Sequence, residues 1–582
     1  MADIPRPEHP RPDLRREDDW WMNLNGVWQF AHDPGVSGEA RGYTSGTEFD
    51  SQIVVPFCPE SRLSGIGERD FFNSVWYRKL VDIPERWQGR RVLLHVGACD
   101  YEATAWLNGQ EAARHRGGYT PFTAELTDLI ESGSGEEVVI RAVDPIRSGK
   151  LPHGKQAERY HSHGCSYTRT TGIWQTVWLE AVPRTYVRRI AVWPDLDSGR
   201  FTVRLNVDGQ DAFSGRVTAL ADGEAVGEGS FEGRGRGAVW VEVPLEEVRP
   251  WKAGQGFLYQ LVVELEGEGG RDRVSTWAGL RKFHTEGNRF FLNNEPIFLR
   301  TVLDQGFYPD GIYTAPSAEA LEADIEASMA FGFNGARLHE KLFEPEFLHL
   351  CDRKGYLVFG EYADWYSPMN EAEWVHDMVD QWREAVNRDL SHPAIIGWCP
   401  LNESGGANRT LYGEWVTRTL YRWTRTVDPT RPVLDTSGYF HFETDVWDCH
   451  NYQQDVEKFR AAFEPLARGD WENAFNNDKN QLPYRGQCPY FVSEYGGIQW
   501  RMGETPEDSW GYGRAPRTRE EFLERFRGLA EALLHNPGVA GFCYTQLTDV
   551  EQEVNGLLTY NRREKFPPEE TAEILQQEAA CE

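Results

Sequence analysis

The hydrophobic pattern changes near residue 285, and this change constrains the fold more than any other feature of the chain. After it, short apolar runs alternate with amphipathic stretches of helical period, as in parallel α/β folds. In one stretch Ser317 is a potential cap, and Leu321, Ile325 and Met329 lie on one face. The strand candidates are residues 297–303, 335–339, 356–361, 395–402, 433–437, 446–451, 490–494 and 541–547. This pattern predicts a catalytic (β/α)8 TIM barrel over residues 284–582.

The chain before this point has the pattern of β structure. Residues 1–183 contain short alternating runs with turn signals such as Asn108-Gly109 between them, which predicts a β-sandwich. Residues 184–283 continue the pattern in a smaller unit, whose size fits an immunoglobulin-like β-sandwich. We therefore predict a multidomain β plus α/β protein.

Charge and cysteine content exclude several classes of function. The 582 residues include 61 basic and 91 acidic side chains, a formal net charge of −30. Nucleic acids and anionic membranes require a basic surface, so we expect neither as a partner. The nine cysteines form no CxxC pair, and no apolar segment is typical of a signal peptide or a membrane span. These features predict a cytoplasmic protein without a metal site or cofactor.

Polar and ionisable residues follow nearly every predicted barrel strand. Barrel enzymes place their chemistry at the carboxyl ends of the strands, so we expect these side chains to meet at one mouth. In chain order they are Asp304, Arg337, His339, Glu361, Asn402, Glu403, Asp435, His450, Tyr452, Glu494, Gln546 and Asp549.

Two of these residues, Glu403 and Glu494, follow apolar runs on the fourth and seventh predicted strands. Cleavage of a glycosidic bond requires a pair of carboxyl groups: one protonated to donate to the leaving oxygen, the other ionised to attack the anomeric carbon. In retaining enzymes the two lie about 5–5.5 Å apart. Either glutamate alone could equally be a solvated loop residue or the partner of a buried arginine.

The Asn402-Glu403 pair on strand four, with a glutamate on strand seven, resembles the signature of retaining glycosidases built on (β/α)8 barrels. Within that clan the chain resembles glycoside hydrolase family 2, the β-galactosidase, β-glucuronidase and β-mannosidase family, in its short three-domain form. Matching segments occur along nearly the whole chain, and any one of them alone is weak evidence. They include residues 24–28, 76–78, 106–109, 118–122, 172–174, 291–293 and 333–339.

The resemblance implies a sugar-binding jelly-roll β-sandwich, an immunoglobulin-like sandwich and a catalytic barrel. It also implies that Glu403 is the acid/base, Glu494 the nucleophile and Asn402 the partner of the sugar 2-hydroxyl. Tyr452 is placed like the tyrosine that hydrogen-bonds the nucleophile, and Arg337 like an arginine that keeps it ionised.

Other residues at the predicted mouth have two interpretations. Asp304, His339, Glu361 and His450 bind sugar hydroxyls or form supporting salt bridges. Trp365 stacks on sugar or packs locally. The loop at 161–171 resembles one that reaches the barrel mouth in family relatives.

The choice of sugar is less constrained. β-Glucuronidases of the family carry an Asn-x-Lys pair after the last strand that holds the substrate carboxylate, whereas the comparable stretch here is Asn555-Gly556-Leu557-Leu558. Lys341 or Arg169 could bind a uronic acid by another route. We find no Glu-x-His metal ligands like those of the large family galactosidases.

The sequence thus predicts a retaining exo-β-glycosidase that acts on a terminal non-reducing sugar, with β-galactosidase as the default specificity. A β-glucuronidase, β-galacturonidase or α-L-arabinosidase using the same machinery is the alternative. An inactive carbohydrate-binding protein is the alternative of another class. By analogy with the family we expect a glycoside substrate and a homo-oligomer, either dimer or tetramer.

Overall fold

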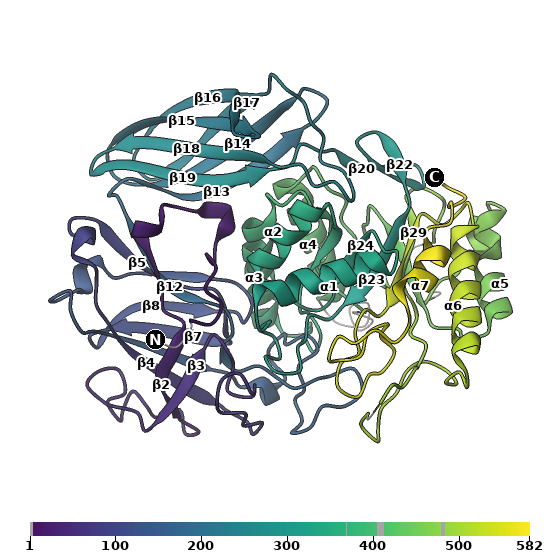
Figure 1. Cartoon of the computed structure of the whole chain (residues 1–582), viewed down its shortest axis with the longest axis horizontal. Coiled ribbons are helices and arrows are strands. Elements are labelled where there is room, and N and C mark those ends of the chain that lie inside the picture. The colour runs from purple at the N-terminus through teal and green to yellow at the C-terminus, as the bar shows by residue number, and fades with distance from the viewer. Residues whose placement is uncertain (1–3, 368, 404–411, 479–482, 504) are drawn as a thin grey trace.

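The computed structural model describes residues 4–582 except 368, 404–411, 479–482 and 504. Figure 1 shows three groups of elements in chain order: a purple β unit that contains the N-terminus, a teal β unit above it, and a green-to-yellow α/β unit that carries the C-terminus. Within the described ranges, no helix is both long and apolar enough to cross a membrane. All nine cysteines are free thiols.

The first β unit is a two-layer sandwich. Its strands are β1 (Trp21–Asn23), β2 (Gly26–His32), β3 (Ser51–Val55), β4 (Ser74–Val81), β5 (Arg91–Val96), β6 (Cys99–Asp100), β7 (Glu102–Leu107), β8 (Gln110–Arg116), β9 (Phe122–Glu125), β10 (Glu136–Val143), β11 (Gly172–Ile173) and β12 (Val177–Val182). One sheet has the order β1-β12-β5-β9 and the other β3-β2-β4-β10-β7-β8. Trp28 and Ile140 of the larger sheet share one core with Leu94 and Leu179 of the smaller. The alternating sequence pattern therefore predicted this layer structure correctly.

The second β unit also has two sheets around one core. Its strands are β13 (Tyr186–Asp195), β14 (Arg200–Asp208), β15 (Ala212–Ala221), β16 (Glu224–Arg234), β17 (Gly237–Pro244), β18 (Tyr259–Gly267) and β19 (Gly270–Ala278). The sheet orders are β13-β14-β17 and β16-β15-β18-β19. Phe201 of the first and Leu261 of the second belong to the same core. The exact domain boundaries, 183/184 and 283/284, stay predictions.

A small antiparallel sheet leads into the α/β unit. It consists of β20 (Phe283–Glu286), β21 (Arg289–Leu292) and β22 (Glu295–Ile297). Phe283 and Phe290 of this sheet are fully buried in the hydrophobic core of the α/β unit, and Phe290 meets Phe491 edge to face.

The α/β unit contains a seven-stranded sheet in which the strands pair in parallel, with the order β26-β25-β24-β23-β29-β28-β27. Its strands are β23 (Leu299–Asp304), β24 (Gly335–Leu338), β25 (Leu357–Glu361), β26 (Ile395–Cys399), β27 (Trp447–Asn451), β28 (Tyr490–Gly496) and β29 (Gly541–Thr545). The helices are α1 (Ala318–Ala330), α2 (Pro345–Lys354), α3 (Ala372–Asp389), α4 (Gly413–Val427), α5 (Val456–Ala467), α6 (Arg519–Leu534) and α7 (Pro568–Leu575). Ser317 caps α1 as predicted, because its hydroxyl accepts a hydrogen bond from the Ala320 amide.

The prediction of a regular fifth strand at residues 433–437 is wrong. This segment makes isolated parallel bridges to the end of the fourth strand, between Trp398 and Val433 and between Asn402 and Ser437. On its other side, the Ser437 hydroxyl donates to Asp448 of β27 at 2.9 Å. The segment thus occupies the gap between β26 and β27 and completes the circular order of a (β/α)8 barrel.

A buried carboxylate accounts for the irregular backbone there. Asp435 accepts hydrogen bonds from the amides of Thr436 and Phe442, and from His441 Nδ1 at 2.7 Å. Local bonds of this kind compete with a regular strand ladder. The hydrophobic pattern of residues 433–437 does not reveal this competition.

Candidate active site

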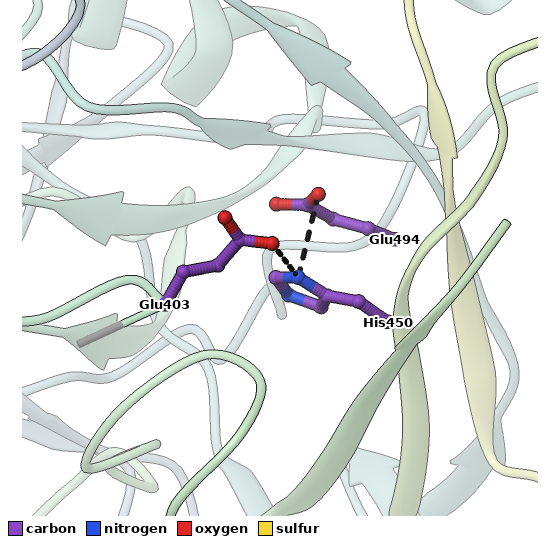
Figure 2. Close-up of side chains that lie close together, drawn as sticks. All are labelled: Glu403, His450 and Glu494. Atoms are coloured by element: carbon purple, nitrogen blue, oxygen red, sulfur yellow. Dashed lines mark hydrogen bonds and ion pairs between the residues drawn. The ribbon is translucent and has the colours of Figure 1, made fainter. Parts of the chain in front are cut away.

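Glu403 and Glu494 meet at the mouth of the barrel (Figure 2). Glu494 lies on β28, and Glu403 follows the end of β26, so both leave the carboxyl ends of barrel strands. One carboxylate oxygen of each, together with a ring nitrogen of His450, lie within 4.8 Å of one another. Carboxylate oxygens this close favour the pair of a retaining enzyme, whose carboxyl groups lie about 5–5.5 Å apart, over that of an inverting enzyme, at roughly 6.5–9.5 Å.

Glu494 is buried and held by two donors. Tyr452 donates its hydroxyl to Oε2 at 2.5 Å, and Arg337 donates Nη1–H to Oε1 at 3.1 Å. Burial and the charge of Glu403 oppose ionisation of Glu494, but the positive charges of His450 and Arg337 outweigh them and lower the pKa of this carboxyl. Glu494 therefore stays ionised, as a nucleophile must.

Arg337 on β24 links three other groups at the mouth. Its Nε donates to Glu361 Oε1 at 2.5 Å, and its Nη2 donates to Asn402 Oδ1 at 3.0 Å. The guanidinium also reaches the Ser493 carbonyl, next to Glu494, at 2.8 Å. The side chain is completely buried, so each of these charge-assisted bonds lies in a low dielectric.

Glu403 has a different environment from Glu494. Its side chain is 24% exposed, against 6% for Glu494. Its backbone has a φ of +47°, and its amide donates to the Ser437 carbonyl at 2.7 Å. The left-handed turn of the backbone at this residue places the carboxylate beside His450. Glu403 is thus the more accessible member of the pair.

His450 connects the two carboxylates. Its Nδ1 lies 2.7 Å from Glu403 Oε1 and 3.4 Å from Glu494 Oε2, while its Nε2 lies 3.0 Å from the Ser437 hydroxyl. Burial disfavours the charged ring, but Glu494 and Glu403 outweigh burial and raise the pKa of His450. Conversely, burial raises the pKa of Glu403, but the hydrogen bond and charge of His450 outweigh it and lower that pKa. A proton can therefore be held between His450 and Glu403.

His339 and Glu361 support Arg337. His339 Nδ1 lies 3.1 Å from Glu361 Oε2, whose other oxygen accepts the Arg337 bond. Burial lowers the pKa of His339 well below its ordinary value, so the ring is neutral and Nδ1 is the donor. Its Nε2 points to Glu494, 4.0 Å away. Both residues are buried, which favours the supporting role over direct sugar contact.

The structure brings two predicted residues to the mouth in other roles. Asp304 is buried and accepts a hydrogen bond from the Gly306 amide at 2.9 Å, and burial with the charge of Asp324 raises its pKa to about 6. Among the described residues, Asp304 makes no hydrogen bond to Glu403 or Glu494. Trp365 carries the Lys155 ammonium 3.6 Å from its ring centroid, so one ring face is already occupied.

The loop at 161–171 reaches the barrel, as the resemblance implied. Tyr167 donates its hydroxyl to Glu553 at 2.6 Å, and Trp510 donates its indole N–H to the Gly164 carbonyl at 2.8 Å. Both partners lie in barrel segments around the mouth. The first β unit therefore forms part of the wall beside the glutamate pair.

Two residues of the site were not found from the sequence. Tyr512 stacks on Tyr452 with ring centroids 3.5 Å apart, and Lys155 approaches the mouth from the first β unit. Neither follows a predicted barrel strand. The only available signal was the closeness of Lys155 to the predicted loop at 161–171.

Glu403, His450 and Glu494 also have the atom types and spacing of a candidate cation site. However, Tyr452 and Arg337 already donate to the oxygens of Glu494, and the Arg337 charge would repel a divalent ion. The arrangement suits proton transfer better than metal binding.

Comparison with known proteins identifies the barrel. Residues 283–526 match the family model described as glycosyl hydrolases family 2, TIM barrel domain.

The barrel of this chain belongs to glycosyl hydrolase family 2.

Relatives of this glycoside hydrolase include β-glucuronidases and a β-galactosidase. A β-glucuronidase of Paenibacillus borealis is 26% identical over 456 residues, which cover 73% of this chain and 74% of that one. A β-glucuronidase of Felis catus is 26% identical over 468 residues, covering 73% and 69%. A β-galactosidase of Thermoanaerobacter pseudethanolicus is 26% identical over 349 residues, covering 58% and 46%.

A solved structure shares the fold of the whole family 2 chain. The β-glucuronidase from Ruminococcus gnavus in complex with N1-substituted uronic isofagomine superposes with a TM-score of 0.79 at 20% identity. The match covers 96% of this chain and 99% of the other. The family model confirms the predicted family and TIM barrel, and together with the named relatives it shows that the chain is a glycoside hydrolase.

We expect His450→Gln to move the alkaline limb of the pH profile of kcat/KM to lower pH. In the native site His450 and Glu403 share a proton, and the raised pKa of His450 retains it to higher pH. The variant leaves carboxyl groups alone to hold that proton, and these ordinarily release it near pH 4.3. Initial rates across pH on one aryl glycoside measure the limb. His535→Gln, at an exposed histidine, is the control. An unchanged alkaline limb would contradict the shared proton.

Proposed function

We propose that this family 2 hydrolase is a retaining exo-β-glucuronidase, with Glu403 as acid/base and Glu494 as nucleophile. The close but unequal glutamate pair carries the mechanism: carboxylate oxygens lie within 4.8 Å, with Glu494 buried between donors and Glu403 more exposed beside His450. Two carboxyl groups in different environments are what double displacement needs.

The first half of the reaction uses the two glutamates in opposite roles. The ionised Glu494 attacks the anomeric carbon while the bond to the leaving oxygen breaks. Glu403 passes to that oxygen the proton that it shares with His450. The product is a glycosyl ester of Glu494. Arg337 holds Asn402 in place, and we propose that Asn402 binds the sugar 2-hydroxyl.

The second half reverses these roles. Esterification removes the charge of Glu494, and with it one of the charges that stabilise the protonated form of the site. Glu403 then takes a proton from water, and the resulting hydroxide attacks the anomeric carbon and releases Glu494. The sugar leaves with retained configuration because the carbon is inverted twice.

The choice of a glucuronide rests on the relatives. β-Glucuronidases match over most of this chain, whereas the β-galactosidase match covers less of both chains. These similarities favour the alternative specificity over the default β-galactosidase. Lys341 and Arg169 do not supply the missing substrate-binding cation, since both donate to backbone carbonyls.

We also propose jelly-roll and immunoglobulin-like topologies for the two β units, a cytoplasmic location, and a homo-oligomer. The two-sheet cores of both units support the first of these. The net charge of −30 supports a protein that binds neither nucleic acid nor anionic membrane.

A panel of nitrophenyl glycosides tests the sugar. We expect kcat/KM to be highest for the β-D-glucuronide, compared with the β-D-galactoside, β-D-galacturonide and α-L-arabinoside. A galactoside that reacts faster than the glucuronide would restore the default specificity. A panel without any turnover, together with sugar binding by calorimetry, would support the inactive binding protein.

We expect Glu403→Gln to lower kcat by about 10²–10⁴-fold on substrates with poor leaving groups. Glu494→Gln should lower kcat still further, since no covalent intermediate can form. Azide should rescue Glu494→Gly with an α-glycosyl azide and Glu403→Gly with a β-glycosyl azide. Glu472→Gln, at an exposed glutamate, is the control. Near-native turnover in either catalytic variant, with an unchanged melting temperature, would refute its role.

We expect full activity after dialysis against EDTA. The proposed steps require only protein groups, and Glu494 already has two protein donors. The measurement is kcat/KM before and after dialysis, with and without added Mg²⁺. A loss of activity that Mg²⁺ restores would show that the glutamate pair binds a metal after all.

A further inference from the structure

A short segment of the first β unit, residues 153–155, lies on the ends of two barrel strands. The His153 amide donates to the Trp365 carbonyl at 3.3 Å. Gly154 has a φ of +55°, and a Cβ there would lie 2.5 Å from the Glu340 carbonyl oxygen and 2.9 Å from Cβ of Ala363. Only glycine permits this approach. The segment is therefore fitted against the barrel mouth.

Lys155 extends from this segment toward the glutamate pair. The residue is 5% exposed, and its ammonium lies 3.6 Å from the ring centroid of Trp365. Among the residues that the structure describes, its Nζ has neither a hydrogen bond nor an ion pair. A buried ammonium without an anion is costly, and a cation–π contact offsets only part of that cost.

The surroundings of Lys155 are acidic. Burial lowers its pKa, but Cys165, Glu553, Glu494 and Glu403 outweigh burial and raise it, so the ammonium is charged. Its charge acts in turn to lower the pKa of Glu403. None of these acids lies within the 4.0 Å of an ion pair. The Lys155 ammonium thus faces the site where the sugar must bind, but none of the surrounding acids forms an ion pair with it.

The other cations around the mouth are already engaged. Arg337 is bound to Glu361, Asn402 and Glu494. Lys565 donates to Asp549 at 2.6 Å, in the segment that follows β29. Asn555 of the same segment accepts a bond from Gln546 and donates to Glu553. In the described part of the mouth, Lys155 is the cation left for a ligand.

We propose that Lys155 binds the carboxylate of a uronic acid sugar in the glutamate site. The inference rests on the proposed uronidase function and names the residue of this chain that selects its substrate. A carboxylate gives the buried ammonium its missing counter-ion, whereas the hydroxymethyl group of a neutral hexose leaves it unpaired. It also offsets the repulsion that an anionic sugar meets from Glu403, Glu494 and Glu553.

The test is the ratio of kcat/KM for nitrophenyl β-D-glucuronide to that for nitrophenyl β-D-glucoside, which differ at the carboxylate. We expect Lys155→Met to lower this ratio about 10- to 150-fold, the range of a charge-assisted hydrogen bond. Lys155→Arg keeps the charge with a different geometry and should retain part of the ratio. Lys150→Met, at an exposed lysine shortly before this segment, should leave the ratio unchanged.

A binding measurement separates recognition from catalysis. We expect D-glucuronic acid to bind the native enzyme more tightly than D-glucose by calorimetry, and Lys155→Met to remove that difference. Melting temperatures verify that the variants fold. Trp365→Phe should lower the kcat/KM ratio less than Lys155→Met, because it keeps a ring under the ammonium.

Two results would overturn the proposal, and they differ. In the first, the native enzyme prefers the glucuronide, but Lys155→Met keeps the full ratio or lowers kcat/KM equally for both substrates. Lys155 is then not the carboxylate partner, and the uronidase function stands. If the native enzyme prefers neutral glycosides and D-glucuronic acid binds no better than D-glucose, the proposed sugar fails, and the role of Lys155 fails with it.

Discussion

The site depends on one buried guanidinium. Arg337 leaves β24 and donates to groups on three other strands or strand ends: Glu361, Asn402 and Glu494. Without it, two buried carboxylates would lose their counter-ion and Asn402 would lose the donor that orients it. Removing one partner of a buried charge network costs more stability than the whole network contributes, because the remaining charges stay buried without a partner. The geometry of the mouth therefore follows from this side chain.

The charge balance around Arg337 explains why the two glutamates differ. Arg337 and Tyr452 stabilise the ionised form of Glu494, whereas the nearest cationic group to Glu403 is His450, which can give up its proton. A permanent cation fixes a carboxylate as an anion, while a titratable neighbour lets the other carboxylate gain and lose a proton. The assignment of nucleophile and acid/base is thus supported by local electrostatics as well as by family resemblance.

The strand-end rule located most of the site from the sequence. Arg337, Glu361, Asn402, His450 and Glu494 come together because parallel strands bring their carboxyl ends to one edge. The rule needs only approximate strand positions, so the wrong prediction of a strand at residues 433–437 did not change the set of site residues. That error arose because the side chain of Asp435 replaced the regular strand ladder with local bonds, which an apolar pattern does not encode.

The strand-end rule does not predict contacts between the β units and the barrel. Lys155 and Trp365 are far apart in the sequence, and their contact depends on how the first sandwich packs on the barrel. In the structure Gly154 marks that packing, since its positive φ and the nearby Glu340 carbonyl exclude any side chain. The barrel strands supply carboxylates that can cleave a glycosidic bond, but in the part of the barrel that the structure describes, the strand ends supply no unpaired cation. A specificity determinant carried on the first β unit can therefore change while Arg337 and the glutamate pair stay fixed, which lets one catalytic arrangement serve different sugars.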